Sequence, residues 1–146
     1  MTMRRGAVLV AAAGVLVSGF IHFYLYFRGG YRSIAPDEFA GLTISRSFAL
    51  NAIAAVVIAE VLVLSIRFAR LAVPAALAAG GFAASTLLAY VLARTTGLLG
   101  FKDDQTSTEA VIALVAEAVV LVAVAVGLRR SPVQVGPDEP GRLDST

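Results

Sequence analysis

The sequence predicts an all-α integral membrane protein in which four transmembrane helices form a bundle. The chain has 146 residues, of which 58% are hydrophobic and only 15% charged, and its mean hydropathy is +0.83. The apolar residues are concentrated in four runs that are each long enough to cross a bilayer. The arginines gather at the ends of these runs, where their side chains can reach headgroups or water.

The first run covers residues 6–27 and contains no formal charge. As a helix it would be about 33 Å long, which is enough for the hydrocarbon core. A cleaved signal peptide is the weaker interpretation, because no A-x-A site follows and the apolar run continues to Phe27. Gly29 and Gly30 are expected to supply the left-handed residue that ends this helix.

The remaining spans are expected at residues 44–66, 72–93 and 107–128. Thr106 and Glu109 fit a capping box, which would start the last span at about Ser107. In the third span, two small-residue patterns predict close packing against another helix, Gly80-xxx-Ala84 and Gly81-xxx-Ser85. The four spans form one domain over residues 1–130.

Two segments outside the spans are also assigned from composition. Pro36, Asp37 and Glu38 resemble the first turn of a short surface helix that runs through Leu42, with proline and acids at its positive end. Residues 131–146 contain prolines, glycines and scattered charges, and they predict a disordered tail.

The distribution of basic residues predicts the orientation. With four spans both termini lie on one side, which carries seven of the twelve basic residues and leaves five on the other. The positive-inside rule therefore favours cytoplasmic termini. Together with the alanine-rich, arginine-rich composition, this favours the inner (plasma) membrane of a bacterium.

A set of polar residues is predicted at similar depth in the outer half of the bundle. His22 lies about 8 Å, Asn51 about 10 Å and Glu117 about 15 Å from the outer end of their spans, by helical rise. Tyr90 and Arg94 close the third span. Polar groups in spans usually face protein, so we expect these five residues to form one cluster.

Several roles are open for this outer cluster. Its members can hydrogen-bond across helices as structural contacts. They can also bind a quinone head group or a polar lipid, or hold a proton. A metal or haem site is the least favoured, because the chain has one histidine and no cysteine. No resident cofactor is expected.

Glu60 is expected to face another direction. It is nine residues from Asn51, which places it near the opposite side of the second helix. One interpretation is a carboxyl that reaches water or is compensated by Arg67 or Arg70. The other is an interface with a partner membrane protein or a second copy of this chain.

The outer arginines, Arg28, Arg32 and Arg46, have three interpretations. They bind lipid phosphates, pair with Asp37 and Glu38, or form the mouth of a site for an anionic ligand. The nearby aromatic residues predict an interfacial aromatic belt, and they are Phe20, Phe23, Tyr24, Tyr26, Phe27 and Tyr31.

No catalytic motif is present in the sequence. There is no Walker A motif, no dinucleotide-binding glycine pattern, no HExxH and no second histidine. Nothing indicates nucleic-acid binding, because the arginines sit at span ends. We therefore expect a non-enzymatic accessory subunit of a larger membrane complex, with a quinone- or lipid-binding protein as the alternative.

The chain resembles a group of small four-span membrane proteins from high-GC Gram-positive bacteria. The similarity lies in IHFYLYF with GYRSI, in FALNAIAAVV, in the GLLGF loop and in Glu117 of the last span. The resemblance implies the four-span fold and implies no chemistry.

Overall fold

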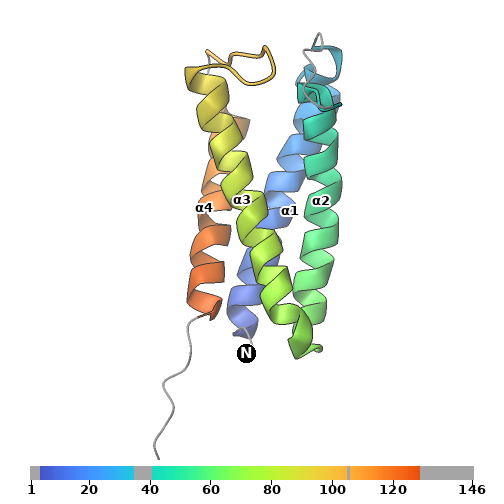
Figure 1. The fold of residues 1–146 in the computed structure, drawn as a ribbon, viewed down its shortest axis with the longest axis vertical. Helices are drawn as coiled ribbons and strands as arrows, with labels where there is room; N and C mark the ends of the chain where they lie inside the picture. The colour runs from blue at the N-terminus through green and yellow to red at the C-terminus, as the bar shows by residue number, and fades with distance from the viewer. Residues whose placement is uncertain (1–3, 35–40, 105, 129–146) are drawn as a thin grey trace, which may run out of the picture.

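Four long helices make up most of the computed structural model, which describes residues 4–34, 41–104 and 106–128 (Figure 1). They are α1 (Arg5–Arg28), α2 (Ile44–Ser65), α3 (Ala72–Thr95) and α4 (Thr108–Leu128). Each is long and apolar enough to cross a membrane. The predicted all-α four-helix fold is therefore confirmed. The expected surface helix lies outside the described residues up to position 40, and its last two residues, Gly41 and Leu42, are not helical. The expected tail at 131–146 also lies outside the described residues.

The two glycines after α1 have different tasks. The Gly29 N–H donates to the Leu25 carbonyl at 2.9 Å and keeps a right-handed φ of −81°. Gly30 has φ +81° and turns the chain into the short 3-10 helix η1 (Tyr31–Ser33). The left-handed residue predicted at this helix end is thus Gly30.

Hydroxyl side chains cap the starts of α2 and α4. Thr43 Oγ1 accepts from the Arg46 N–H at 3.1 Å. Ser107 Oγ accepts from the Ala110 N–H at 3.1 Å, and the Ser107 carbonyl accepts from Val111. The expected cap at Thr106 is wrong by one residue, because Ser107 occupies the position whose side chain reaches the free amides.

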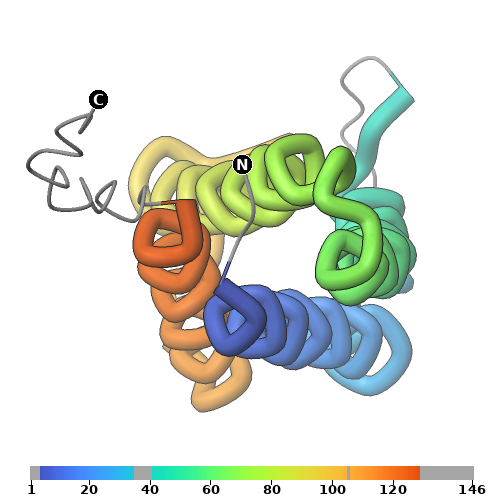
Figure 2. Tube along the Cα trace, turned by 90° about the horizontal axis from the view of Figure 1, so that it is seen from below, coloured from blue at the N-terminus to red at the C-terminus, as the bar shows by residue number. Residues whose placement is uncertain are grey.

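The helices form a ring in chain order when viewed along the bundle (Figure 2). α1 packs mainly on α2 and α4, whereas α3 closes the ring opposite α1 and barely touches it. A second 3-10 helix, η2 (Ala69–Leu71), joins α2 to α3. The start of α1 and the end of α4 lie at the same end of the bundle (Figure 1).

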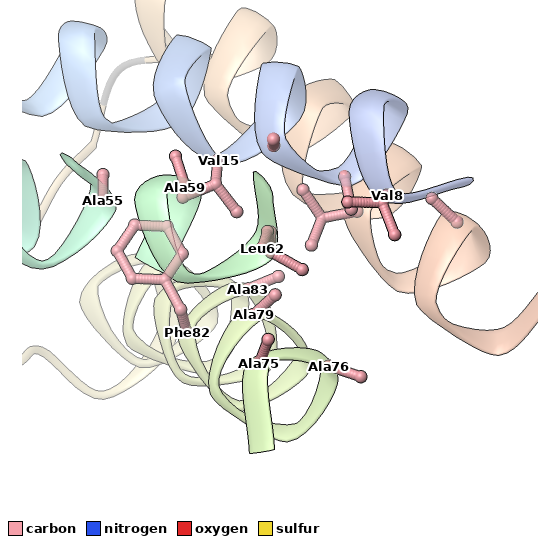
Figure 3. Close-up of a cluster of buried hydrophobic side chains, with 14 of the residues drawn as sticks. Val8, Val15, Ala55, Ala59, Leu62, Ala75, Ala76, Ala79, Phe82 and Ala83 are labelled. Atoms are coloured by element: carbon pink, nitrogen blue, oxygen red, sulfur yellow. The ribbon is translucent and has the colours of Figure 1, made fainter. Parts of the chain in front are cut away.

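The core between the helices is filled mainly by small side chains (Figure 3). Its larger members are Val8 and Val15 of α1, Leu62 of α2 and Phe82 of α3. The α3 face is alanine, with Ala75, Ala76, Ala79 and Ala83 at 0% exposure. Apart from Phe82, the residues of α3 in this core are alanines, and their small side chains allow α3 to approach the other helices.

The close glycine contacts lie on α1 and not on α3. A Cβ built on Gly14 would lie 2.7 Å from Val120 Cγ2 and 3.0 Å from the Ala116 carbonyl oxygen. A Cβ on Gly19 would overlap the Cβ of Ala55. In contrast, a Cβ on Gly81 would meet nothing within 4 Å, and one on Gly80 only Val124 at 3.8 Å. The expectation that the α3 glycines mediate close packing within this chain is therefore wrong.

Candidate functional site

Three buried polar side chains join α1 to α4 in the half of the bundle that lies away from the start of α1, which is called the outer half below. Ser18 Oγ donates to Glu117 Oε1 at 2.8 Å. His22 Nδ1 lies 2.8 Å from the Ser18 carbonyl oxygen, one helical turn earlier. A carbonyl oxygen can only accept, so Nδ1 carries the hydrogen. The three residues are 0% (Ser18), 7% (His22) and 1% (Glu117) exposed.

The second oxygen of Glu117 has no partner. Oε2 is buried and, among the described residues, no donor lies within hydrogen-bond distance of it. Leaving a buried polar atom unpaired costs about 1–3 kcal/mol, and more if the group is charged. Such an atom in a folded protein calls for an explanation, and a bound molecule is one.

Glu117 and His22 line a cavity of about 120 Å³ between the four helices. Its other polar lining residues on the helices are Ser47 and Asn51 of α2, and Thr86 and Tyr90 of α3. A dry apolar cavity of about 150 Å³ holds benzene, so this space is close to the size of one ring. Glu117 lies about 14 Å along α4 from its outer end.

The loop between α3 and α4 covers the outer end of this cavity. Leu98 and Phe101 exchange backbone hydrogen bonds at 2.8 and 2.9 Å, and Leu99 and Gly100 between them have positive φ. This tight turn places Leu98 and Phe101 in the cavity lining. Asp103, also in the lining, is held by a hydrogen bond from its N–H to the Ala93 carbonyl at 3.0 Å.

Aromatic rings form the wall between the loop and His22. Tyr31 stacks on Phe48 with ring centroids 4.3 Å apart, and its edge meets Phe101 at 5.5 Å. Phe48 in turn contacts the His22 ring at 5.1 Å. Burial raises the pKa of the Tyr31 hydroxyl, and the negative charge of Asp103 raises it further.

Four of the five residues expected in the outer cluster line this one cavity, namely His22, Asn51, Tyr90 and Glu117. Arg94 does not line it. Its Nη1 donates to the Asp103 carbonyl at 2.9 Å, so the guanidinium holds the loop in place. Arg94 was expected in the cluster from its depth in the span, but its guanidinium contacts the loop and not the cavity lining.

The outer arginines also lie away from the cavity lining. Arg28, Arg32 and Arg46 are exposed, and Arg46 Nη1 donates to the Gly41 carbonyl at 2.6 Å. Their predicted partners Asp37 and Glu38 lie outside the described residues. An anion site at the mouth of this cavity therefore gains no support from their placement.

Glu60 lies apart from the cavity, as its position opposite Asn51 suggested. It is exposed in a shallow groove whose other lining side chains are all apolar, from α1 (Ala12, Leu16) and α2 (Val56, Ala59, Val63, Leu64). Within the described residues no ion pair joins it to Arg67 or Arg70, the basic residues expected to compensate it.

Ser18 is the site residue that the sequence reasoning missed. A serine within a span is a weak signal, because its hydroxyl can bond to its own helix. The spacing Ser18–His22 was the available clue, since residues four apart share a helix face.

The donor set does not suggest a metal. In the described parts of the chain, no three histidine, cysteine or acidic side chains gather closely enough to hold an ion.

Comparison of the chain with protein-family models, curated proteins and solved structures gave no match.

Proposed function

We propose that this protein is a multi-pass membrane protein that binds a small, ring-bearing molecule in the outer cavity of its bundle. The observation that carries the proposal is the unpartnered Glu117 Oε2, buried beside a cavity of about 120 Å³. A carboxyl that served only as a structural contact would be expected to have both oxygens hydrogen-bonded. A ligand with a polar end would provide the missing partner.

The cavity lining favours a ring over a phospholipid headgroup. Phe48, Tyr31, Tyr90 and Phe101 offer ring faces or edges, and no lysine or arginine is among the lining residues. A phosphate would lack the basic partners that recognise it. Of the two ligand classes considered from the sequence, a quinone in its reduced form therefore suits the cavity better than a lipid headgroup, because its hydroxyl groups can donate to Glu117.

Thermal unfolding in lipid nanodiscs tests the proposal. We expect the one-ring probes hydroquinone and benzyl alcohol, which both carry a donor hydroxyl, to raise the unfolding temperature of the wild type. Ala89→Phe fills the cavity, because Ala89 lines it, and should remove the response. Ala84→Phe is the matched control, since Ala84 is exposed on the same helix. If the probes raise the unfolding temperature of both variants equally, they bind outside this cavity.

A second function, an accessory subunit of a larger membrane complex, is favoured by Glu60. An exposed carboxyl among apolar side chains at membrane depth is costly against lipid, and a partner helix with a hydrogen-bond donor would relieve that cost. Purification in mild detergent should then show a co-migrating protein or a dimer, and Glu60→Leu should release it. A wild-type monomer would count against this function.

We further propose a bacterial plasma membrane with cytoplasmic termini, supported by the excess of arginine on that side. The chain lacks cysteine, so each introduced thiol is unique. A membrane-impermeant maleimide applied to whole cells should label Asp104→Cys in the α3–α4 loop and leave Arg70→Cys unlabelled. The reverse pattern would invert the topology.

A further inference from the structure

The chemical character of the cavity narrows the kind of molecule that it takes. Glu117 has no counter-ion: in the described structure no basic side chain pairs with it, and Ser18 stands between it and His22. A buried carboxylate without a partner is strongly unfavourable, whereas a paired one is not. A ligand that brings positive charge would supply the partner.

His22 adds an acceptor to the same end of the cavity. Its Nδ1 donates to the Ser18 carbonyl, so in the neutral ring the second nitrogen, Nε2, can only accept. Glu117 and His22 thus offer acceptors. An ammonium group, which has several N–H donors and no acceptor, matches this pair.

The lining of the cavity contains no lysine or arginine that could pair with Glu117. Arg94, the nearest described arginine along α3, uses its Nη1 to bind the Asp103 carbonyl and is not in the lining. A buried carboxyl group without a basic residue beside it favours a cation in the cavity.

The aromatic wall suits the ring of the ligand. Phe101, Tyr31 and Phe48 contact one another in series between the loop and His22. Tyr31 and Phe48 stack on each other, so one face of each ring is covered. The wall is therefore an apolar surface against which a ring edge or a methyl group of the ligand would pack.

We infer that the outer cavity takes a small organic cation, an ammonium group attached to a ring, with the nitrogen paired to Glu117. This inference rests on the proposed ligand-binding function and specifies its ligand class. It excludes molecules that carry a phosphate or a carboxylate. It also predicts that a neutral quinone binds more weakly than an amine of equal size.

Three probes of nearly equal shape test the inference: benzylammonium, benzyl alcohol and benzoate. Binding to the wild type in nanodiscs is measured by calorimetry at neutral pH and fixed salt, with empty nanodiscs subtracted. We expect benzylammonium to bind about tenfold or more tightly than benzyl alcohol, and benzoate to bind least. Equal binding of the amine and the alcohol would overturn the inference that the ligand is a cation, and it would leave the proposed binding of a ring intact. No binding of any probe would overturn both.

Two glutamine variants test whether the preference for a cation comes from Glu117. Glu117→Gln keeps the size of the side chain and an acceptor for Ser18, and should bind benzyl alcohol and benzylammonium equally. Glu60→Gln, which removes a carboxyl outside the cavity, should keep the wild-type preference. A preference that survives in Glu117→Gln would overturn the role of Glu117. The wild-type comparison needs no variant, so it decides even if Glu117→Gln does not fold.

Discussion

The contact of Gly19 with α2 leads to a prediction in which the cost of one methyl group can be estimated. A Cβ at this position would overlap the Cβ of Ala55, and it would also lie 3.7 Å from the Ala55 Cα and the Ala52 carbonyl oxygen. Carbon atoms are in optimal contact at about 3.5–4.0 Å. Gly19→Ala must therefore push α1 and α2 apart, because alanine has no rotamer that avoids the contact.

The size of the effect follows from two opposing terms. Overpacking of a closely packed contact costs about 1–3 kcal/mol. Replacing glycine with alanine inside a helix returns about 0.5–1 kcal/mol through helix propensity. We expect Gly19→Ala to lower the free energy of unfolding by about 1–2 kcal/mol. Gly81→Ala, where a Cβ would meet nothing within 4 Å, should raise it slightly.

Unfolding in mixed micelles by SDS titration, followed by circular dichroism, measures both variants. The double variant Gly19→Ala with Ala55→Gly moves the methyl group to the other helix and should recover most of the loss. If Gly19→Ala is as stable as Gly81→Ala, the close approach of α1 and α2 is not present in solution. If the second change gives no recovery, Ala55 is not the residue that Gly19 contacts.

Three further predictions follow. Ser18→Ala removes the one hydrogen bond that the described residues donate to the Glu117 side chain, and it should cost about 0.6–1.7 kcal/mol by the same titration; no loss would mean that the bond is absent. Burial raises the pKa of the Tyr31 hydroxyl. The contribution of Tyr31 to the free energy of unfolding is therefore fully present below the ordinary pKa of about 10, and it is lost as the pH rises through the raised pKa. The titration of Tyr31 is followed by tyrosinate absorbance, and Tyr31→Phe identifies its part of the signal. That part should titrate above the ordinary range of tyrosine, and Asp103→Asn should lower the pKa of Tyr31. A pKa in the ordinary range would refute the burial of Tyr31. Glu60→Leu should stabilise the isolated monomer, since a carboxyl facing lipid is costly; an unchanged or lower unfolding temperature would contradict its exposure.

The fold was predictable because hydropathy and length decide whether a segment can span a membrane. The depth of a residue in a span can be predicted equally well, because it follows from the helical rise. This is why His22, Asn51, Tyr90 and Glu117, from four different helices, were placed together in advance and line one cavity.

Rotation of the helices about their axes was harder to predict. Gly80 and Gly81 match a packing motif, yet the contacts that need glycine are at Gly14 and Gly19. A motif does not indicate which face of a helix meets its neighbour within the chain. Arg94 shows the same limit for a long side chain, since its guanidinium lies several bonds from the backbone position that was predicted.

The bond between Ser18 and Glu117 has a consequence for biosynthesis, because its two residues are 99 positions apart. At about 5–20 residues per second, α4 is made roughly 5–20 s after α1. During that interval α1 is present without the helix that packs on its Gly14 face and satisfies Ser18. The cavity lacks its Glu117 wall for the same time, so a nascent chain could not hold the proposed ligand. Occupancy of the site would therefore mark a chain whose last helix has been made and inserted.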